Sequence, residues 1–540
     1  MKYLRLIGYG FLILFFAVLV ALATIFVPEL VSTWGGDGLD VDSDNTSVSV
    51  PKLLNRTTAS DYAKRKTSSK NRDILLVTVD TLRADHLSFM GYPKNTTPFM
   101  DTLAGRGVTF TRAFSPTSVT APAHASILTS LYPLQHRVRK NGQGMNSDIT
   151  TLQQILRKAG YQTAGAVSTE SHFSPSNLSQ GFELFDDPES EDKWYRSEMS
   201  GGKDYLPYRP AERTVARAED QLRQVSDTQP LFMWVHFYDP HSPYTKRPNE
   251  LKSVSLRDDE KRGGWIEYIE QQRGFDLKAG PRRIPAYQLY DSEIRHVDRL
   301  LKSFYDTFRR LRDQKPFTVL TADHGEGMGN HGYWAHDMHI YNEQVHVPLI
   351  LDWPEDTGPN KTIQTAVELT DITPTILHYA GVDSGTLREV RNLPFEGSPL
   401  QSLVKNENTG EFGYALMQRR TYEGISFREW FRVRFLQATT DPVNYPFEGR
   451  AAANYEVGKR YALTDGTNKY FYQTELYDEY YDLTGNFIER RNLIDKRPGA
   501  AEMGSKLYEI IRFFEQKTYP EGFVINETDR KKLEALGYIN

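Results

Sequence analysis

Short apolar runs that end in acidic or histidine residues recur along the chain. Uninterrupted apolar runs of this length are typical of strands that are buried on both faces of a parallel sheet. Five such strands are predicted, at residues 73–81 (DILLVTVDT), 161–168 (YQTAGAVS), 230–244 (PLFMWVHFYDPHSPY, which runs into a proline-broken loop), 316–327 (PFTVLTADHGEG) and 347–354 (VPLILDWP).

Helical patterns lie between these runs, notably at 152–160, where LQQILRKAG ends at a glycine, and at 287–312. Alternating strands and helices predict an α/β sandwich around a mostly parallel sheet. Ligands of such sheets bind beyond the carboxyl ends of the strands. Asp80, Asp323 and His324 all fall at such ends, so they are the first candidates for a functional site.

The pattern changes after about residue 408. Shorter runs joined by turn residues are predicted as antiparallel strands at 431–440, 459–466 and 468–478. A helix is predicted to follow at 501–517. We therefore expect a catalytic α/β domain over residues 72–408, and a small C-terminal α+β subdomain with a tail helix over 409–540.

The N-terminus carries a different signal. Residues 6–27 contain no charge, and this run is long enough to cross a bilayer as a helix. Lys2 and Arg5 precede it, which favours a cytoplasmic tail and an exported chain. Residues 1–30 are predicted as a transmembrane anchor, or alternatively a signal peptide, and 31–71 as a flexible tether. The catalytic domain is then expected outside the cytoplasm, in the periplasm or at the cell surface.

Composition narrows the classes of function. The chain has 540 residues and a net charge of −5 without a basic field, which argues against nucleic acid as a partner. It contains no cysteine, which excludes disulfides, thiolate metal sites and cysteine nucleophiles, and favours a prokaryotic source. Polar insertions at 186–209 and 249–284 are either solvated loops or a rim that selects substrate.

The acidic residues at the strand ends are candidate metal ligands. A single strand-end acid often caps the next helix, but Asp80 and the pair Asp323-His324 occupy two strand ends. Carboxylate oxygens bind hard divalent cations, and an imidazole also admits Mn or Zn. These three side chains would form an open site with room for a nucleophile and a substrate oxygen.

Histidines are clustered near the same strand end. Five of the 13 fall in one short stretch: His324, His331, His336, His339 and His346. His236 and His241 flank the segment FYDP. Such clustering is more typical of a site than of isolated structural histidines, although His331 and His346 are expected to serve as scaffold.

The stretch SPTSVTAPAHASILTS at 115–130 holds a candidate nucleophile. Thr120 stands at the start of a helix predicted to begin near Ala121, and such a helix end favours an anion. A threonine hydroxyl needs an activating base or metal ion to act as a nucleophile. The alternative is that Thr120 only caps the helix, with Pro122 in its first turn, and the two roles are compatible.

Eight segments are weak signals singly but specific in their order and spacing: DILLVTVDTLRADHLSFMGY, TAPAHASILTSLYP, GYQTAG, VHFYDPHSPY, TADHGEGMGNHGYWAH, YNEQVHVPLIL, DITPTILHYAGV and ELYDEYYDLTGN. Together they resemble the sulfatase family of the alkaline phosphatase superfamily, over about residues 73–540. The resemblance implies an alkaline-phosphatase-like α/β/α sandwich around a mixed sheet, followed by a small C-terminal domain with a four-stranded antiparallel sheet.

The resemblance also implies roles for individual residues around one divalent cation (Mn, Zn, Ca or Mg). The implied metal ligands are Asp80, Thr120, Asp323 and His324. Thr120 matches the nucleophile, and His241 matches a histidine that contacts the ester or protonates the leaving group. The other implied pocket residues are His336, near a family lysine, His124, where the family signature has arginine, and Lys140 and Asn141. A second cation held by Asp239, His241 and His336 or His339 is left open.

Three departures from the family pattern point towards phosphorus. The family has Cys or Ser in C/S-x-P-x-R, which becomes formylglycine, whereas TAPAH at 120–124 offers a threonine that cannot form this aldehyde. Asp80-Thr81 replaces the usual Asp-Asp pair, and His324 replaces the usual Asn. Similar relatives that use threonine include nucleotide pyrophosphatase/phosphodiesterases and the phosphoethanolamine and phosphoglycerol transferases. A sulfated alkoxide is hard to release, whereas water or an alcohol can attack phosphothreonine at phosphorus.

The expected function is metal-dependent hydrolysis or transfer of phosphate esters, of phosphodiester or phosphonate type, through a covalent Thr120 intermediate at the cell envelope. The expected substrate is an anionic ester such as a lipid headgroup, an envelope glycan or a small ester. Two alternatives stay open, namely a sulfatase that works without formylglycine and an inactive member that binds anionic glycans.

Overall fold

The computed structural model describes residues 72–524 with gaps, the longest of which are 189–208, 255–285 and 420–459. The predicted N-terminal anchor and tether, most of the two polar insertions and the strand predicted at 431–440 lie outside the described residues. Within the part that is described, no helix is both long and apolar enough to span a bilayer.

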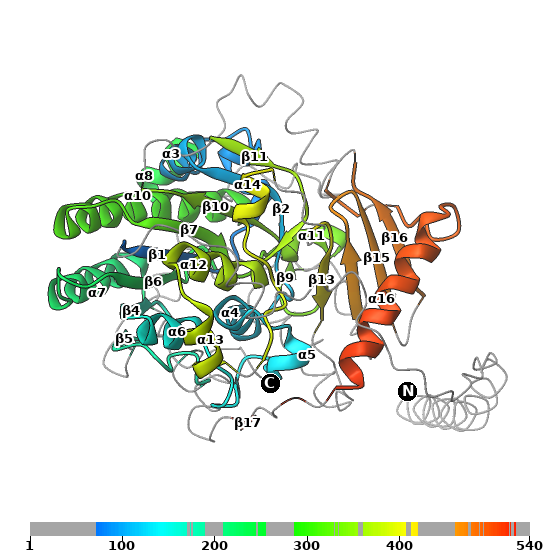
Figure 1. Ribbon diagram of the computed structural model, residues 1–540. Helices are drawn as coiled ribbons and strands as arrows, with labels where there is room; N and C mark the ends of the chain where they lie inside the picture. Colours follow the sequence, from blue (N-terminus) through cyan, green and yellow to red (C-terminus); the bar gives the residue numbers. More distant parts are fainter. Residues whose placement is uncertain are drawn as a thin grey trace, which may run out of the picture. The chain divides into compact units, whose positions relative to one another are not determined.

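A nine-stranded mixed sheet forms the centre of the larger domain (Figure 1). Its main path runs β11-β2-β10-β7-β1-β6-β4-β5, and β12 pairs with β2. In chain order the strands are β1 (Ile74–Val79), β2 (Val108–Phe114), β4 (Gln162–Val167), β5 (Leu184–Asp186), β6 (Leu231–Phe237), β7 (Phe317–Ala322), β10 (His346–Asp352), β11 (Lys361–Ile363) and β12 (Val367–Glu368). β10 is antiparallel to β2 and β7, and the other described pairs are parallel. The predicted mixed, mostly parallel sheet is confirmed.

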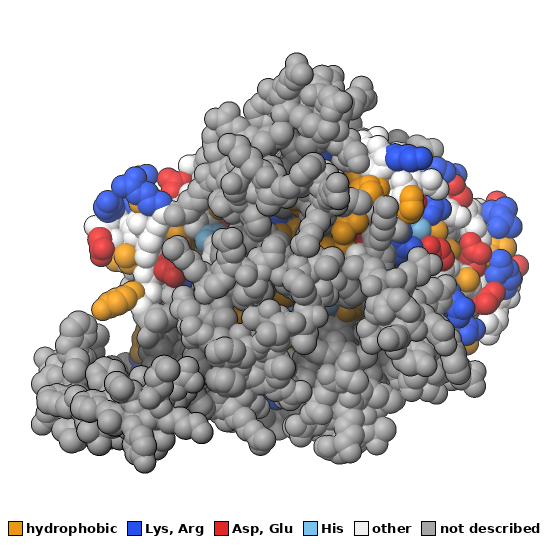
Figure 2. Space-filling model, turned by 180° about the vertical axis from the view of Figure 1, so that it is seen from behind, with side chains coloured by type: hydrophobic (Ala, Val, Ile, Leu, Met, Phe, Trp, Pro, Cys, Tyr) orange, Lys and Arg blue, Asp and Glu red, His pale blue; other side chains and the backbone are white. Residues whose placement is uncertain are grey.

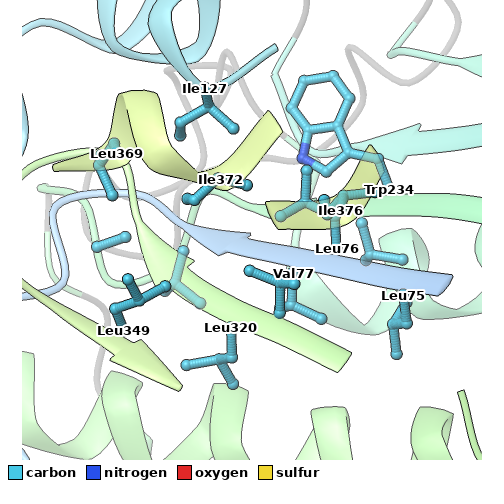
Figure 3. Packing of buried hydrophobic residues seen from close by; sticks show 14 of the residues in the cluster. Leu75, Leu76, Val77, Ile127, Trp234, Leu320, Leu349, Leu369, Ile372 and Ile376 are labelled. Atoms are coloured by element: carbon cyan, nitrogen blue, oxygen red, sulfur yellow. The ribbon is translucent and has the colours of Figure 1, made fainter. Parts of the chain in front are cut away.

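β1 lies inside the sheet, and its sequence ILLVTV explains why. All six residues are buried, with β6 on one side and β7 on the other, both parallel and in register along its length. In Figure 3, Ile127, Ile372 and Ile376 lie on the same side of the sheet as Trp234. Each large apolar side chain buried in this way contributes about 1.5–3 kcal/mol relative to exposure. β1 is therefore a rigid base for whatever follows Val79.

Helices cover both faces of this sheet, as Figure 1 shows. One layer contains α3 (Pro98–Arg106), α7 (Ala211–Gln224), α8 (Pro248–Val254) and α10 (Ala286–Arg312). The other contains α4 (Thr120–Thr129), α6 (Leu152–Lys158), α12 (Ile372–Ala380) and α13 (Ser384–Val390). The helices predicted at 152–160 and 287–312 correspond to α6 and α10. The predicted α/β/α sandwich is confirmed.

A small antiparallel sheet follows in the chain. Its order is β13 (Ala415–Gln418), β14 (Arg460–Thr464), β15 (Asn468–Gln473) and β16 (Glu479–Asp482), and α16 (Gly499–Glu515) packs on it. The predicted four-stranded antiparallel sheet with a tail helix is confirmed. Tyr461, Leu463 and Leu507 form part of its core.

The small sheet contacts the segment that leads to Thr120. Gln418 N–H donates to the Pro116 carbonyl at 2.8 Å, and Leu416 N–H donates to Glu368 Oε1 at 2.6 Å. The end of β13 therefore supports the loop between β2 and α4, which has to be fixed if it carries a nucleophile.

The described surface is charged in a mixed pattern. On the face shown in Figure 2, Lys and Arg side chains of the described residues are interspersed with Asp and Glu. This mixed pattern agrees with the small net charge of −5.

Candidate active site

The carboxyl ends of β1 and β7 bring the predicted acidic residues together. The strands are parallel neighbours with Val79 opposite Ala322, so the residues that follow, Asp80 and Asp323, emerge side by side. Together with His324 they offer one ligand atom each within 4.8 Å of one another, and all three residues are buried. The structure therefore joins three predicted ligands from two distant segments.

Acceptor atoms crowd this site. Both carboxylate oxygens of Asp80 and the Oδ2 atom of Asp323 have no hydrogen-bond partner among the described residues. His324 Nε2 lies 3.8 Å from Asp80 Oδ1 and 3.4 Å from Asp323 Oδ2. Burial, followed by the charges of Asp323 and Glu326, raises the pKa of Asp80 well above its ordinary value. Buried carboxylates are costly in this state unless a cation or a donor compensates them.

The donor set fits a divalent cation. His324 Nδ1 lies 2.9 Å from the Gly325 carbonyl and must donate to it, so Nε2 carries the lone pair that faces the carboxylates. Burial lowers the pKa of His324 to about 3, which keeps the imidazole neutral, as a ligand must be. Two carboxylates, an imidazole and the Thr120 hydroxyl would hold the ion, and this set suits Mn, Zn, Mg or Ca.

The hydroxyl of Thr120 is directed at the same site. Thr120 is the first residue of α4, and extended Val119 precedes it in the capping position. Thr120 Oγ1 lies 3.2 Å from His324 Nε2, and Ala121 N–H donates to Asn141 Oδ1 at 2.9 Å. The interpretation of Thr120 as only a helix cap is therefore not supported. Asn141, which the family resemblance placed near the pocket, contacts this helix end directly, and Lys140 precedes it in the chain.

His241 and His336 form a hydrogen-bonded pair. Their Nε2 atoms are 2.8 Å apart, and His241 Nδ1 donates to the Ser242 carbonyl at 2.5 Å. With Nδ1 of His241 protonated, the neutral ring accepts at Nε2, so the proton between the rings belongs to His336 Nε2. The His336 ring centroid is 4.5 Å from that of His324, and burial lowers the pKa of His241 to about 4. The structure thus brings both predicted acid candidates next to the predicted ligands.

His124 lies in a buried chain of hydrogen bonds. Its Nδ1 donates to the Thr120 carbonyl at 2.8 Å, and its Nε2 accepts from Thr78 Oγ1 at 3.1 Å. Thr78 Oγ1 in turn accepts from Trp234 Nε1 at 2.9 Å and contacts His236 Nδ1 at 2.9 Å. Both ring nitrogens of His124 are hydrogen-bonded within the protein, and these bonds help to hold α4 in position. Its predicted catalytic role stays a prediction.

The second cation site considered from the sequence does not form among the described residues. Asp239 Oδ1 accepts from Arg247 Nη2 at 2.7 Å, and its Oδ2 accepts from Ala211 N–H at 3.0 Å. His339 Nδ1 lies 3.4 Å from Arg460 Nη1. A carboxylate that already neutralises a guanidinium, and an imidazole beside another one, are poor ligands for a cation. Only the set described above brings three ligand residues together in the part of the chain that is described.

Two of the clustered histidines have structural partners, as expected. His331 Nδ1 lies 2.8 Å from Glu343 Oε1, and its Nε2 lies 2.6 Å from the Glu489 carbonyl. His346 Nε2 lies 2.8 Å from the Thr111 carbonyl.

Three residues near the site were not predicted as part of it. Thr78 could have been found, because it lies two residues before Asp80 on the same face of β1. Glu326 is buried beside the ligands, and burial raises its pKa to about 8. Tyr290, on α10, hydrogen-bonds the backbone next to Asp80. No local pattern points to Tyr290, since it is more than two hundred residues away in the chain.

The family model that matches the chain is Sulfatase, over residues 72–382. This is more than half of the chain, and the chain therefore belongs to the sulfatase family. The resemblance inferred from the motifs is confirmed at the level of the family.

Individual relatives are distant. An ulvan-active sulfatase of Formosa agariphila is 24% identical over 359 residues, covering 62% of this chain and 65% of the relative. An N-acetylglucosamine-6-O-sulfatase of Bacteroides thetaiotaomicron is 21% identical over 573 residues, covering 92% and 94%. The crystal structure of a phosphonate monoester hydrolase of Agrobacterium radiobacter has a TM-score of 0.58 at 20% identity, covering 82% of this chain and 96% of that one. The structural similarity to the hydrolase supports the fold. The names of these three proteins include both sulfatases and a phosphonate ester hydrolase.

Proposed function

We propose that the chain hydrolyses or transfers phosphate-type esters, of phosphodiester or phosphonate kind, through a covalent intermediate on Thr120. The observation that carries the proposal is the Thr120 hydroxyl, 3.2 Å from His324 Nε2 at the N-terminus of α4, in a chain that has no cysteine. Asp80, Asp323 and His324 would hold a divalent cation beside it. When bound, the cation supplies charge that favours the alkoxide of Thr120 and stabilises the reacting ester.

The reaction divides into two displacements. In the first, Thr120 Oγ1 forms a bond to phosphorus, its proton leaves to solvent, and the bond from phosphorus to the leaving oxygen breaks. In the second, water attacks the phosphothreonine, the bond from phosphorus to Oγ1 breaks, and Thr120 regains a proton. An acceptor alcohol in place of water would make the same chain a transferase. The backbone N–H groups at the start of α4 favour the anionic group in both steps.

The histidine pair serves the leaving group. His336 Nε2 carries the proton between the two rings, and His241 Nε2 accepts it. When this pair takes up a further proton from solvent, the resulting imidazolium can protonate the leaving oxygen as the ester bond breaks, and the pair returns to its neutral form. Replacing His241 by Asn should therefore slow turnover of an alkyl ester by about a hundredfold or more. An aryl ester with a good leaving group should be slowed far less, and equal losses on both esters would assign His241 to binding instead.

Sulfate-ester hydrolysis is the second candidate, because the named relatives include sulfatases. A threonine sulfate would have to be attacked at sulfur, since threonine lacks the hydrate that releases sulfate from formylglycine. A member that only binds anionic glycans is the third candidate. The buried acceptors of Asp80 and Asp323 argue against it, since binding a glycan does not require them.

The site is proposed to work at the cell envelope. This rests on the charge-free run at residues 6–27, which lies outside the described residues. A lipid headgroup, an envelope glycan or a small exported ester would then be within reach, and a membrane-bound catalytic domain would be extracytoplasmic.

The test compares wild type with Thr120→Ala on a nitrophenyl phosphodiester, a nitrophenyl phosphonate ester and a nitrophenyl sulfate, with metal content read on the same samples. Turnover of a phosphorus ester, with a phosphoryl-type mass adduct on the Thr120 peptide that the variant lacks, supports the proposal. Turnover of the sulfate alone supports the second candidate. No turnover by wild type, together with glycan binding that Thr120→Ala retains, supports the third.

A further inference from the structure

The backbone directly after Asp80 is strained. Thr81 is fully buried and has φ of +53°, in the left-handed region that β-branched residues avoid. Such a conformation costs about 1–3 kcal/mol and persists only where the surrounding structure imposes it. Something must therefore hold this turn.

Tyr290 spans the turn from outside. Its hydroxyl donates to the Thr81 carbonyl at 2.7 Å and accepts from the Arg83 N–H at 2.9 Å. The ring is fully buried and packs edge-on against His86 and Tyr244, with centroid distances of 5.1 Å and 5.6 Å. One rigid side chain from α10 thus satisfies two buried backbone groups on either side of Leu82.

The same turn orients both carboxylates of the site. It carries Asp80 at its start, and Thr81 N–H donates to Asp323 Oδ1 at 3.2 Å. The His324 N–H donates to the same Oδ1 at 2.7 Å. With Oδ1 of Asp323 occupied by two backbone donors, its Oδ2 is the atom that faces His324 Nε2. A shift of Thr81 would therefore move two carboxylates at once.

We propose that Tyr290 is a positioning residue for the cation site, and that it acts by holding Thr81 in its left-handed conformation. Partners that orient metal ligands from outside commonly contribute ten- to a hundredfold in metal affinity. The inference rests on the cation site of the proposed function, but not on which ester is cleaved.

The experiment measures cation binding to the metal-free protein, with Mn²⁺, Zn²⁺, Ca²⁺ and Mg²⁺ titrated separately and without substrate. Tyr290→Phe removes only the hydroxyl and keeps the ring contacts. The matched control is Tyr305→Phe, fifteen residues further along α10 and about 22 Å away along the helix. Tyr305 is equally buried, and its hydroxyl accepts from Arg106 Nη2 at 2.7 Å.

The expected result is that Tyr290→Phe raises the dissociation constant of the preferred cation by about ten- to a hundredfold. Tyr305→Phe should leave it within about twofold of wild type, even if both variants lower the melting temperature of the metal-free protein similarly. An unchanged dissociation constant in Tyr290→Phe would overturn the inference. Failure of wild type to bind any of the four cations would overturn the cation site itself, and the inference with it.

A second comparison tests the route through Thr81. Glycine adopts positive φ without strain, so Thr81→Gly should reduce the need for Tyr290. In a Thr81→Gly background, Tyr290→Phe should weaken cation binding by less than about threefold. A full tenfold or greater loss in that background would exclude strain at Thr81 as the means by which Tyr290 acts. This background also serves if Tyr290→Phe alone folds poorly.

Discussion

Two buried polar clusters of this protein are built in opposite ways. The ester site, made of Asp80, Thr120, Asp323 and His324, leaves three carboxylate oxygens without a donor among the described residues, both of Asp80 and Oδ2 of Asp323. The inter-sheet cluster joins the small sheet to the larger domain and consists of His331, Asn342, Glu343, Lys469 and Glu489. Both are enclosed by protein, so their difference is one of chemistry and not of exposure.

In the inter-sheet cluster, charges and hydrogen bonds are matched. Lys469 Nζ donates to the Ile340 carbonyl, Asn342 Oδ1 and Glu489 Oε1 at 2.7, 2.8 and 2.9 Å. An ammonium has three donors, and all three are used. Such a cluster has no capacity left for a ligand, and its role is to fix the small sheet against the loop at 340–342.

In the ester site, hydrogen-bond acceptors outnumber donors, and this excess indicates a site for a cation. Crowded lone pairs are unfavourable in the folded chain until a cation neutralises them. The ester site lowers the stability of the metal-free protein and raises its affinity for a cation. The inter-sheet cluster, in contrast, stabilises the fold. The same kind of substitution should therefore have opposite effects on folding in the two clusters.

The largest effect is expected at the ester site. Asp80→Asn removes one of the two carboxylates, and turnover should fall about ten-thousandfold or more, because cation charge stabilisation is lost. The metal-free variant should be more stable than metal-free wild type by about 1–3 kcal/mol, since a buried like-charged group is gone. Urea unfolding in the presence of a chelator measures this, and a destabilised variant would contradict the comparison.

The next largest effect is expected in the inter-sheet cluster. Lys469→Met leaves Glu489 buried without its partner and should destabilise the protein by about 3–5 kcal/mol. The side chains of both residues are fully buried, so solvent does not replace the lost contact. Urea unfolding at fixed metal concentration measures the effect, and a loss below about 1 kcal/mol would mean that this cluster is not optimised for stability.

A pH effect should follow from His331 in the same cluster. Burial alone lowers the pKa of His331, but the charge and hydrogen bond of Glu343, with Glu489, outweigh it and raise the pKa to about 9. A raised pKa means that this stability is fully present below pH 6.5 and is lost as pH rises through 9, by about 2–3 kcal/mol. His331→Asn, which tolerates the positive φ of 52° there, should flatten the difference in unfolding free energy between pH 6.5 and 9.5.

The smallest effect is expected from an exposed ion pair that serves as the control for Lys469. Lys302 lies 2.6 Å from Asp306 one turn later in α10, and both side chains are exposed. Lys302→Met should change the unfolding free energy by less than about 0.5 kcal/mol. An effect comparable with that of Lys469→Met would show that the loss of any lysine, and not of a buried pair, explains the larger value.

Five strands of the larger sheet were predictable because most of their residues are apolar. β1, β4, β6, β7 and β10 all appear as apolar runs at the predicted places. β2 was not predicted, since VTFTRAF mixes Thr and Arg with apolar residues and becomes a strand through its pairing with β10. The antiparallel direction of β10 was also not predictable, because an apolar run does not indicate whether the strand lies parallel or antiparallel to its neighbours.

The ester site also has a part that the sequence predicted and a part that it did not. Strand-end position and residue type indicated Asp80, Asp323 and His324. The start of a predicted helix and the resemblance to the sulfatase family indicated Thr120. Which histidines face the site, and which are held elsewhere, depended on partners far away in the chain. His331 is engaged by Glu489, and Asp239 by Arg247, so neither is available to a cation.

The sequence by itself determined the five apolar strands and the residue types of the site, because burial on two faces demands apolar runs and strand ends in a parallel sheet meet at one edge. Only the tertiary structure decided which acceptors remain without donors, since that depends on every group that folding places nearby. Tyr290 shows most clearly what the sequence alone does not reveal. Its hydroxyl matters because α10 packs against the turn after β1, and no pattern local to either segment encodes that contact.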